Sequence, residues 1–276
     1  MPNEIDDVTR LMFVGNGREA ESIIALSFDR FLSPTPIHTY IYQGPHNLNY
    51  DLLEKYKEFG INVNNITIIS DAKLIYEYNV SEDFYKFGGW ISQQLLKLMA
   101  LDQCNHNKIL IQDCDIIPIK LYKFFENGAP VLLKKDINNE IKSNNYTSKL
   151  LGISSQTNDC FITEFMPILK TDWISFKEQI EKIHNINWIS AIIKVFNNDI
   201  DHAKSYLNQI QFSEYEILSN WILYNNPIIT VNTQKKLTIF NNITNKNIIG
   251  YDAIHSKHQL TFNEVGSIIN FIEKNI

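Results

Sequence analysis

Two aspartates separated by one residue, Asp113 and Asp115, are the strongest chemical signal in the sequence. They follow the run 108–112 (KILIQ), whose apolar residues predict a buried strand. Ligands of open α/β sheets bind beyond the carboxyl ends of the strands, and side chains two residues apart on a strand project to the same side. Both carboxylates are therefore expected to face one crevice. Their hard oxygen atoms suit Mg²⁺ or Mn²⁺.

A cation held there could act as a Lewis acid and stabilise negative charge on a departing diphosphate. An Asp-x-Asp sequence also arises by chance, and then it commonly caps a turn. The position after an apolar strand favours the metal, because paired carboxylates at a sheet edge repel one another unless something offsets their charge. We therefore predict a divalent cation site.

The elements that must position these residues follow from the periodicity of apolar residues. Strands are expected near 11–15, 37–42, 65–70, 108–112 and 130–134, with helices over 18–32, 50–59 and 90–103 between them. Strands that alternate with helices of this length predict right-handed βαβ units and a parallel sheet. In the second half we expect strands near 159–165, 228–231 and 237–240, and helices over 172–184, 212–224 and 262–273. A short helix is expected at 121–125.

Length and composition predict one domain. The chain has 276 residues, 44% of them hydrophobic, which is enough for a sizeable core. We expect a nucleotide-sugar-binding half over 1–135 and a more irregular acceptor-side half over 136–276. A formal charge of −6 disfavours tight nonspecific binding to nucleic acid.

The cellular setting is predicted from cysteines and apolar runs. Cys104, Cys114 and Cys160 lack zinc-site spacing and are odd in number, which favours a reduced, cytoplasmic protein. No signal peptide is visible, and no apolar run approaches the roughly 20 residues that a membrane span needs. Peripheral association with an inner membrane is the open alternative.

Four motifs in order carry a resemblance to a known family. They are the stretch GWISQQLLKL at 89–98, ILIQDCD at 109–115, FITEFM at 161–166 and FSEYE at 212–216. The chain resembles, over about residues 85–225, a family of mostly uncharacterised bacterial and phage GT-A glycosyltransferases. Two departures are Cys114, where the family usually has Ser, and Glu164, where His is common.

The resemblance implies a GT-A fold, with a Rossmann-like, mostly parallel central sheet flanked by helices. It implies that Asp113 and Asp115 bind Mn²⁺ or Mg²⁺ and a nucleotide-diphosphate sugar, with Asp115 directly catalytic. Gln93, Gln94 and Lys97 would reach the sugar or the diphosphate. The alternatives are solvated glutamines and a surface lysine paired with Asp102.

On the acceptor side, the resemblance assigns Glu214 as a general base on the acceptor hydroxyl or as a ligand of a sugar hydroxyl. A capping role beside Ser213 is its alternative. Trp188 could stack on a sugar ring, although its apolar neighbours also predict core packing. Glu164 is placed on the acceptor side, with a role that its departure from the family pattern leaves open.

Both ends of the chain add candidates. The segment 254–258 resembles the part of many GT-A enzymes that brings a histidine back to the metal, so His255 is a candidate metal ligand and Lys257 a candidate diphosphate ligand. Gly15, Asn16 and Arg18 follow the first strand, where a nucleotide would be received at the start of a helix. A plain strand-to-helix turn explains them equally well.

Asp71 follows the third strand and could contact the ribose or the base. The expected partners are thus a nucleotide-diphosphate sugar and a hydroxyl acceptor. The acceptor could be a surface glycan, a lipid-linked saccharide or, for a phage protein, a hydroxymethylated base in DNA. The last requires a basic groove, for which the sequence offers six lysines: Lys134, Lys135, Lys142, Lys149, Lys235 and Lys236.

Two other classes of function stay open. A noncatalytic nucleotide- or glycan-binding module could use the same fold, with its aspartates only capping a turn. A metal-dependent nucleotidyltransferase also uses paired aspartates. Donor hydrolysis separates the three, since only a glycosyltransferase releases free sugar and nucleoside diphosphate.

Overall fold

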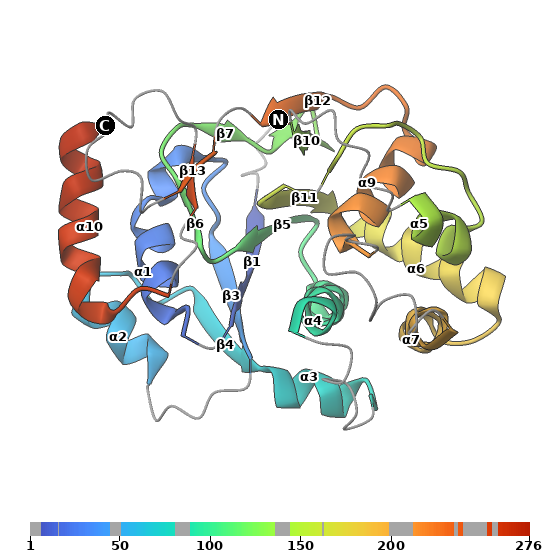
Figure 1. Ribbon diagram of the computed structural model, residues 1–276, viewed down its shortest axis with the longest axis horizontal. Coiled ribbons are helices and arrows are strands. Elements are labelled where there is room, and N and C mark those ends of the chain that lie inside the picture. The colour runs from blue at the N-terminus through green and yellow to red at the C-terminus, as the bar shows by residue number, and fades with distance from the viewer. Residues whose placement is uncertain are drawn as a thin grey trace, which may run out of the picture.

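A computed structural model describes residues 7–15, 17–44, 51–80, 89–135, 144–161, 163–198, 212–234, 237–239, 253–255 and 259–276. A five-stranded sheet lies at its centre, with helices on both faces (Figure 1). The expected α/β architecture with a mostly parallel central sheet flanked by helices is confirmed. Within the described ranges, no helix has the length and apolar character needed to cross a bilayer.

The central sheet has the strand order β11-β5-β1-β3-β4. Strands β1 (Val8–Val14), β3 (His38–Gln43), β4 (Ile66–Ser70) and β5 (Lys108–Asp113) run parallel, whereas β11 (Phe165–Leu169) pairs antiparallel with β5. The strand that carries the aspartates therefore lies between β1 and the antiparallel edge strand. Parallel strands buried on both faces are expected to be apolar, as the middle of β5 is at Ile109, Leu110 and Ile111.

Two layers of helices bury the two faces of this sheet (Figure 1). The layer on one face comprises α1 (Glu19–Ser27), α2 (Leu52–Glu58) and α10 (Phe262–Asn275). The other comprises α3 (Asp71–Glu77), α4 (Gly89–Gln103), α5 (Asn144–Leu151), α6 (Lys170–His184), α7 (Trp188–Asn198) and α9 (Glu214–Asn225). Strand β1 contributes to the cores on both faces of the sheet. Leu11 and Phe13 pack in one core cluster and Met12 and Val14 in the other, because successive side chains of a strand point to opposite faces.

Short strands outside the central sheet complete the fold. They are β2 (Leu32–Ser33), β6 (Ile116–Pro118), β7 (Tyr122–Lys123), β8 (Phe125–Glu126), β9 (Ala129–Pro130), β10 (Leu132–Lys135), β12 (Val231–Gln234), β13 (Leu237–Ile239) and β14 (Ala253–His255), and a 3-10 turn, η1, spans Asp29–Phe31. Strand β14 pairs antiparallel with β6, so the C-terminal part of the chain returns to the segment that follows Asp115.

Three sequence predictions need correction. Residues 121–125 form strands rather than a helix, because Asn127 and Gly128 both have positive φ and turn β8 back onto β9. The strand expected at 159–165 lies instead at Phe165–Leu169, and the strand expected at 228–231 begins only at Val231. The positions of these two strands are set by pairing with distant strands: β11 pairs with β5, and β12 pairs with β10.

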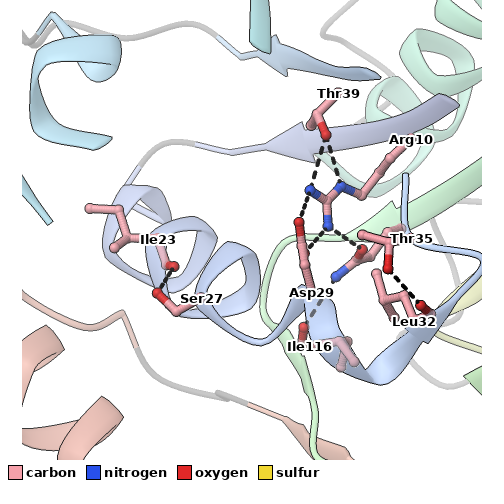
Figure 2. Close-up of polar contacts among 9 residues, drawn as sticks. Arg10, Ile23, Ser27, Asp29, Leu32, Thr35, Thr39 and Ile116 are labelled. Atoms are coloured by element: carbon pink, nitrogen blue, oxygen red, sulfur yellow. Dashed lines mark hydrogen bonds and ion pairs between the residues drawn. The ribbon is translucent and has the colours of Figure 1, made fainter. Parts of the chain in front are cut away.

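One charged side chain is buried inside the sheet. Arg10, on β1, is 1% exposed, and its Nη1 and Nη2 donate to the two carboxylate oxygens of Asp29 at 2.6 and 3.0 Å. Nε and Nη2 also donate to Thr39 Oγ1, at 3.3 and 3.0 Å, and Nη1 to Gln112 Oε1 at 3.5 Å. Figure 2 shows Asp29 and Thr39 converging on the guanidinium. Arg10 thereby ties three strands and the 3-10 turn together, and its charge is compensated as a buried charge requires.

We expect Asp29→Ala to lower the free energy of unfolding by about 2–4 kcal/mol, because it leaves the buried Arg10 without its counter-charge. The value is placed below that of a fully buried pair, since the Asp29 side chain is 29% exposed. Urea denaturation measures it. The matched control is Glu273→Ala, which breaks the exposed Arg30–Glu273 pair and should cost less than about 1 kcal/mol. Equal costs for the two variants would contradict this role of Arg10.

Candidate functional site

The two aspartates flank a tight turn at the carboxyl end of β5. Asp113 is the last residue of this strand, residues 114–115 form the turn, and β6 begins at Ile116. The backbone N–H of Asp113 donates to the carbonyl of Glu164 at 3.2 Å, which fixes the strand end against the chain that leads into β11. Cys114 is 5% exposed and packs in the core cluster beneath α1 and α10.

A cavity of about 380 Å³ lies over this turn. Its wall includes Asp113 and Asp115, Gly15 and Arg18 from the β1–α1 connection, and Gln93 from α4. Five of the predicted donor-site residues, from three separate parts of the chain, thus line one cavity of the size that small-molecule sites have.

Lys97 forms the centre of a buried ion-pair network on one side of the cavity. Its Nζ lies 2.5 Å from Asp113 Oδ1 and 3.0 Å from Glu214 Oε1. Lys97 is 4% exposed and Glu214 is 1% exposed. The lysine therefore pairs with the first aspartate of the motif, and Asp102 instead pairs with Lys177 at 2.7 Å.

Neighbouring side chains enclose this network. The Lys97 ammonium lies 4.6 Å from the centre of the Tyr215 ring, and it is 3.5 Å from the Tyr215 hydroxyl. The Gln94 amide faces the Glu214 carboxylate, to which its nitrogen donates when it is oriented toward that group. Gln94 and Glu214 are both almost fully buried, so this glutamine braces the network rather than reaching into the cavity.

Charge and burial together set the pKa values here. Burial disfavours the charged form of Lys97, yet the charges of Asp113 and Glu214 outweigh it and hold the lysine pKa well above its usual value. Burial raises the pKa of Glu214, although the Lys97 ammonium acts in the opposite direction. The network thus keeps a charged lysine beside the Asp113 carboxylate.

Arg18 forms a second ion-pair network on the other side of the cavity. Its Nη1 lies 3.0 Å from Glu21 Oε1 and 4.0 Å from Asp115 Oδ2. Glu21 is fully buried, whereas the side chains of Arg18 and Asp115 are 25% and 22% exposed. Each aspartate of the motif therefore has a basic neighbour that is itself anchored by a buried glutamate.

The donor set fits a divalent cation that is shared with a ligand. Two carboxylates at a cavity wall supply hard oxygen ligands, as Mg²⁺ and Mn²⁺ prefer. Among the described residues, no group of three or more His, Cys, Asp or Glu side chains could hold a metal. Oxygen atoms of water or of a bound diphosphate would be further ligands, beside any side chain outside the described residues, such as the predicted His255.

The C-terminal candidates lie at the limit of what the structure describes. His255 pairs through its backbone with Ile116, the residue directly after Asp115. The His255 side chain lies outside the described residues, as do Asn16 and Lys257. The predicted return of this segment to the motif is therefore present in the backbone, and the ligand roles stay predictions.

The remaining candidates do not line the described cavity wall. Asp71 is 6% exposed, and its Oδ1 accepts a hydrogen bond from Ala72 N–H at 2.7 Å at the start of α3. Glu164 is 8% exposed and lies 3.7 Å from Lys135 Nζ. A contact of Asp71 with the nucleotide or of Glu164 with the acceptor stays a prediction.

Trp188 needs correction as an acceptor-stacking residue. It is 1% exposed and packs edge-on against Tyr78 and Trp173, with ring centres 5.7 and 5.2 Å away. Because its ring is enclosed by these neighbours, it cannot stack on a sugar without leaving the core. The apolar neighbours of Trp188 in the sequence already indicated this alternative.

Two residues of the site were missed by the sequence reasoning. Glu21 lies three residues after Arg18, a spacing that brings side chains together on a helix. This ion pair could therefore have been predicted from the sequence. Tyr215 lies beside Glu214 in the motif at 212–216, but its contact with Lys97 depends on the packing of α9 on α4. That packing is not encoded locally.

The protein thus has an α/β fold, with paired carboxylates in a cavity at the carboxyl edge of its central sheet. The chain belongs to the family of unknown function DUF6492, which matches residues 14–264. A comparison with curated proteins finds no match. Among solved structures, the galactosyltransferase LgtC in complex with donor and acceptor sugar analogues aligns over 95% of each chain, at 10% identity and a TM-score of 0.47. An active-site mutant of LgtC aligns over 94% of this chain and 95% of its own, at 11% identity and a TM-score of 0.48.

We expect Lys97→Met to lower the free energy of unfolding by about 3–5 kcal/mol, because it leaves the buried Glu214 carboxylate without its counter-charge. Adding Glu214→Gln to this variant should recover part of that loss, since the buried carboxylate is then replaced by a neutral amide. Urea denaturation of both single variants and the double variant measures the coupling. Strictly additive effects would show that Lys97 and Glu214 do not compensate one another.

Proposed function

We propose that this protein is a metal-dependent glycosyltransferase of the GT-A type, which uses a nucleotide-diphosphate sugar as donor and a hydroxyl group as acceptor. The observation that supports it most is the cavity wall, where Asp113, Asp115, Arg18, Gln93 and Gly15 converge. Paired carboxylates for a cation and an arginine for phosphate oxygens are the groups that diphosphate binding needs.

In this proposal Asp113 and Asp115 hold Mn²⁺ or Mg²⁺. When bound, the cation offsets the negative charge of the departing nucleoside diphosphate. Arg18 donates to phosphate oxygens from the cavity rim. Gly15, without a side chain, lets the donor approach the backbone, and Gln93 can donate to a sugar hydroxyl.

Glu214 is assigned a positioning role in place of the predicted general base. Its carboxylate is 1% exposed and is engaged by Lys97 and Gln94. A base must come within hydrogen-bond reach of the proton that it removes, and an acceptor hydroxyl has no access to this buried group. The proposal therefore names no general base and covers both an inverting and a retaining course.

The proposed acceptor is a saccharide, on a surface glycan or linked to a lipid. A DNA acceptor would call for a basic groove, but Lys134 lies 2.9 Å from Asp159 and Lys135 lies 3.7 Å from Glu164. Lys142, Lys235 and Lys236 lie outside the described residues. Lys149 is exposed on α5, with its ammonium 5.6 Å from the centre of the Tyr146 ring. Two of the three described lysines thus already lie beside a carboxylate, which gives the DNA acceptor little support.

The reaction is proposed to take place in a reducing compartment such as the cytoplasm. Cys104, Cys114 and Cys160 all fall within the described residues; each is buried, and none forms a disulfide. Structural disulfides are characteristic of oxidising compartments. Peripheral membrane association is compatible with a lipid-linked acceptor.

A thermal-shift panel of nucleoside diphosphates and nucleotide sugars, with and without Mn²⁺, tests the donor class. A ligand that binds only the folded protein raises its melting temperature in proportion to ln(1 + [L]/Kd). We expect one nucleoside diphosphate to stabilise the protein in the presence of Mn²⁺ and much less in EDTA. No stabilisation by any of them would contradict the proposed function.

The products formed from the stabilising donor then separate the classes of function. A glycosyltransferase slowly releases free sugar and nucleoside diphosphate, a nucleotidyltransferase transfers the nucleoside monophosphate and releases the sugar 1-phosphate, and a binding module leaves the donor intact. The first result is the one that we expect.

We expect Asp115→Asn to reduce Mn²⁺-dependent donor hydrolysis about 100-fold or more, because the loss of a metal ligand removes several kcal/mol of charge stabilisation. The melting temperature of the free protein should change little, since Asp115 is partly exposed. Asp51→Asn is the matched control: Asp51 caps α2 away from the cavity, and asparagine caps equally well. Wild-type hydrolysis by Asp115→Asn would remove this residue from the mechanism.

A further inference from the structure

The two ion-pair networks have the same arrangement. Each has a basic residue between a buried glutamate and one aspartate of the motif: Glu21, Arg18 and Asp115 form the Arg18 triad, and Glu214, Lys97 and Asp113 form the Lys97 triad. With four acidic and two basic side chains, the two triads together carry a formal charge of two negative units. The glutamates differ from the aspartates in that neither reaches the cavity wall that the described residues form.

Glu21 makes two contacts through one oxygen atom. Its Oε1 accepts from Arg18 Nη1 at 3.0 Å and from the backbone N–H of Leu260 at 3.1 Å. Leu260 precedes α10 and belongs to the segment that returns from β14. Glu21, which lies on α1, thus contacts both Arg18 at the cavity and Leu260 in the C-terminal segment, the residues directly before α10.

Close packing fixes this junction. Glu21 is fully buried, and a methyl group placed on Gly17 would come within 2.6 Å of the Gln259 side chain. Contacts between α1 and α10 continue the same interface. Because the surroundings leave Glu21 little freedom, the direction in which it holds the Arg18 guanidinium is defined.

We infer that Glu21 is a positioning residue for the donor diphosphate: it orients Arg18 at the cavity rim and couples that orientation to the C-terminal segment. This inference rests on the proposed function. Arginine presents five N–H donors in a planar fork. Glu21 and Asp115 both lie next to Nη1, so the contact with Glu21 restricts where the guanidinium can lie relative to Asp115 and to phosphate oxygens at the cavity rim.

The test is a double-mutant cycle on the full chain with Glu21→Met, Arg18→Met and the double variant. Methionine matches glutamate in length and removes both acceptor contacts. Because the Arg18 side chain is 25% exposed and still lies 4.0 Å from Asp115, the change leaves no fully buried charge without a counter-charge. The readout is the Kd for nucleoside diphosphate with Mn²⁺, measured by calorimetry. Glu273→Met, at the exposed Arg30–Glu273 pair, is the matched control.

We expect Glu21→Met to weaken diphosphate binding about tenfold, and Arg18→Met by at least as much. In the double variant the second change should have little further effect, because Glu21 acts through Arg18. Glu21→Gln, which keeps an acceptor oxygen for Arg18 and Leu260, should restore most of the affinity. A melting temperature close to that of the wild type would accompany these changes.

Three results would overturn the inference. One is unchanged affinity in Glu21→Met, and another is full additivity in the double variant, which would make the effect of Glu21 independent of Arg18. The third is failure of the wild-type protein to bind any nucleoside diphosphate, which would refute the proposed function as well. If Glu21→Met does not fold, Glu21→Asp takes its place in the cycle, since its shorter side chain withdraws the carboxylate from Arg18 and keeps the charge.

Discussion

The site depends on one electrostatic constraint: two carboxylates stand two residues apart where a buried strand ends. Like charges so close together are unfavourable in a poorly hydrated environment. In this protein, Lys97 lies beside Asp113 and Arg18 lies beside Asp115. The compensation is only partial, because each basic residue also serves a buried glutamate. The negative charge that is left at the cavity favours a cation.

The fold places these charges through four contributions. The β1–α1 connection supplies Arg18, α4 supplies Lys97, the start of α9 supplies Glu214, and the antiparallel return of β14 to β6 brings the C-terminal segment alongside. The β1–α1 connection, α4 and the start of α9 approach the carboxyl edge of the sheet, which is where open α/β sheets bind their ligands. Glu21 and Glu214, which are 0% and 1% exposed, lie deeper than the aspartates they serve, so the two ion-pair networks extend from the core to the cavity.

The parallel strands of the central sheet and the position of Asp113 and Asp115 at the end of β5 were predictable, because apolar periodicity and a two-residue spacing are local properties. Helices α3, α5 and α7 were not predicted, and β11 was expected several residues too early. One miss had a local signal: a helix was expected at 121–125, although the Asn127-Gly128 pair that follows strongly indicates a turn. Other predictions failed where distant packing decides. Glu214 was expected beside an acceptor, and its position next to Lys97 follows from how α9 packs on α4.

Diffraction from crystals soaked in Mn²⁺ and nucleoside diphosphate would test the central claim most directly, because the anomalous signal of manganese distinguishes the ion from water and from lighter atoms. We predict one strong peak between the carboxylates of Asp113 and Asp115, with diphosphate oxygens as further ligands and the Arg18 guanidinium on the phosphate side. A peak elsewhere, or a bound diphosphate with no ion at these two side chains, would contradict the account.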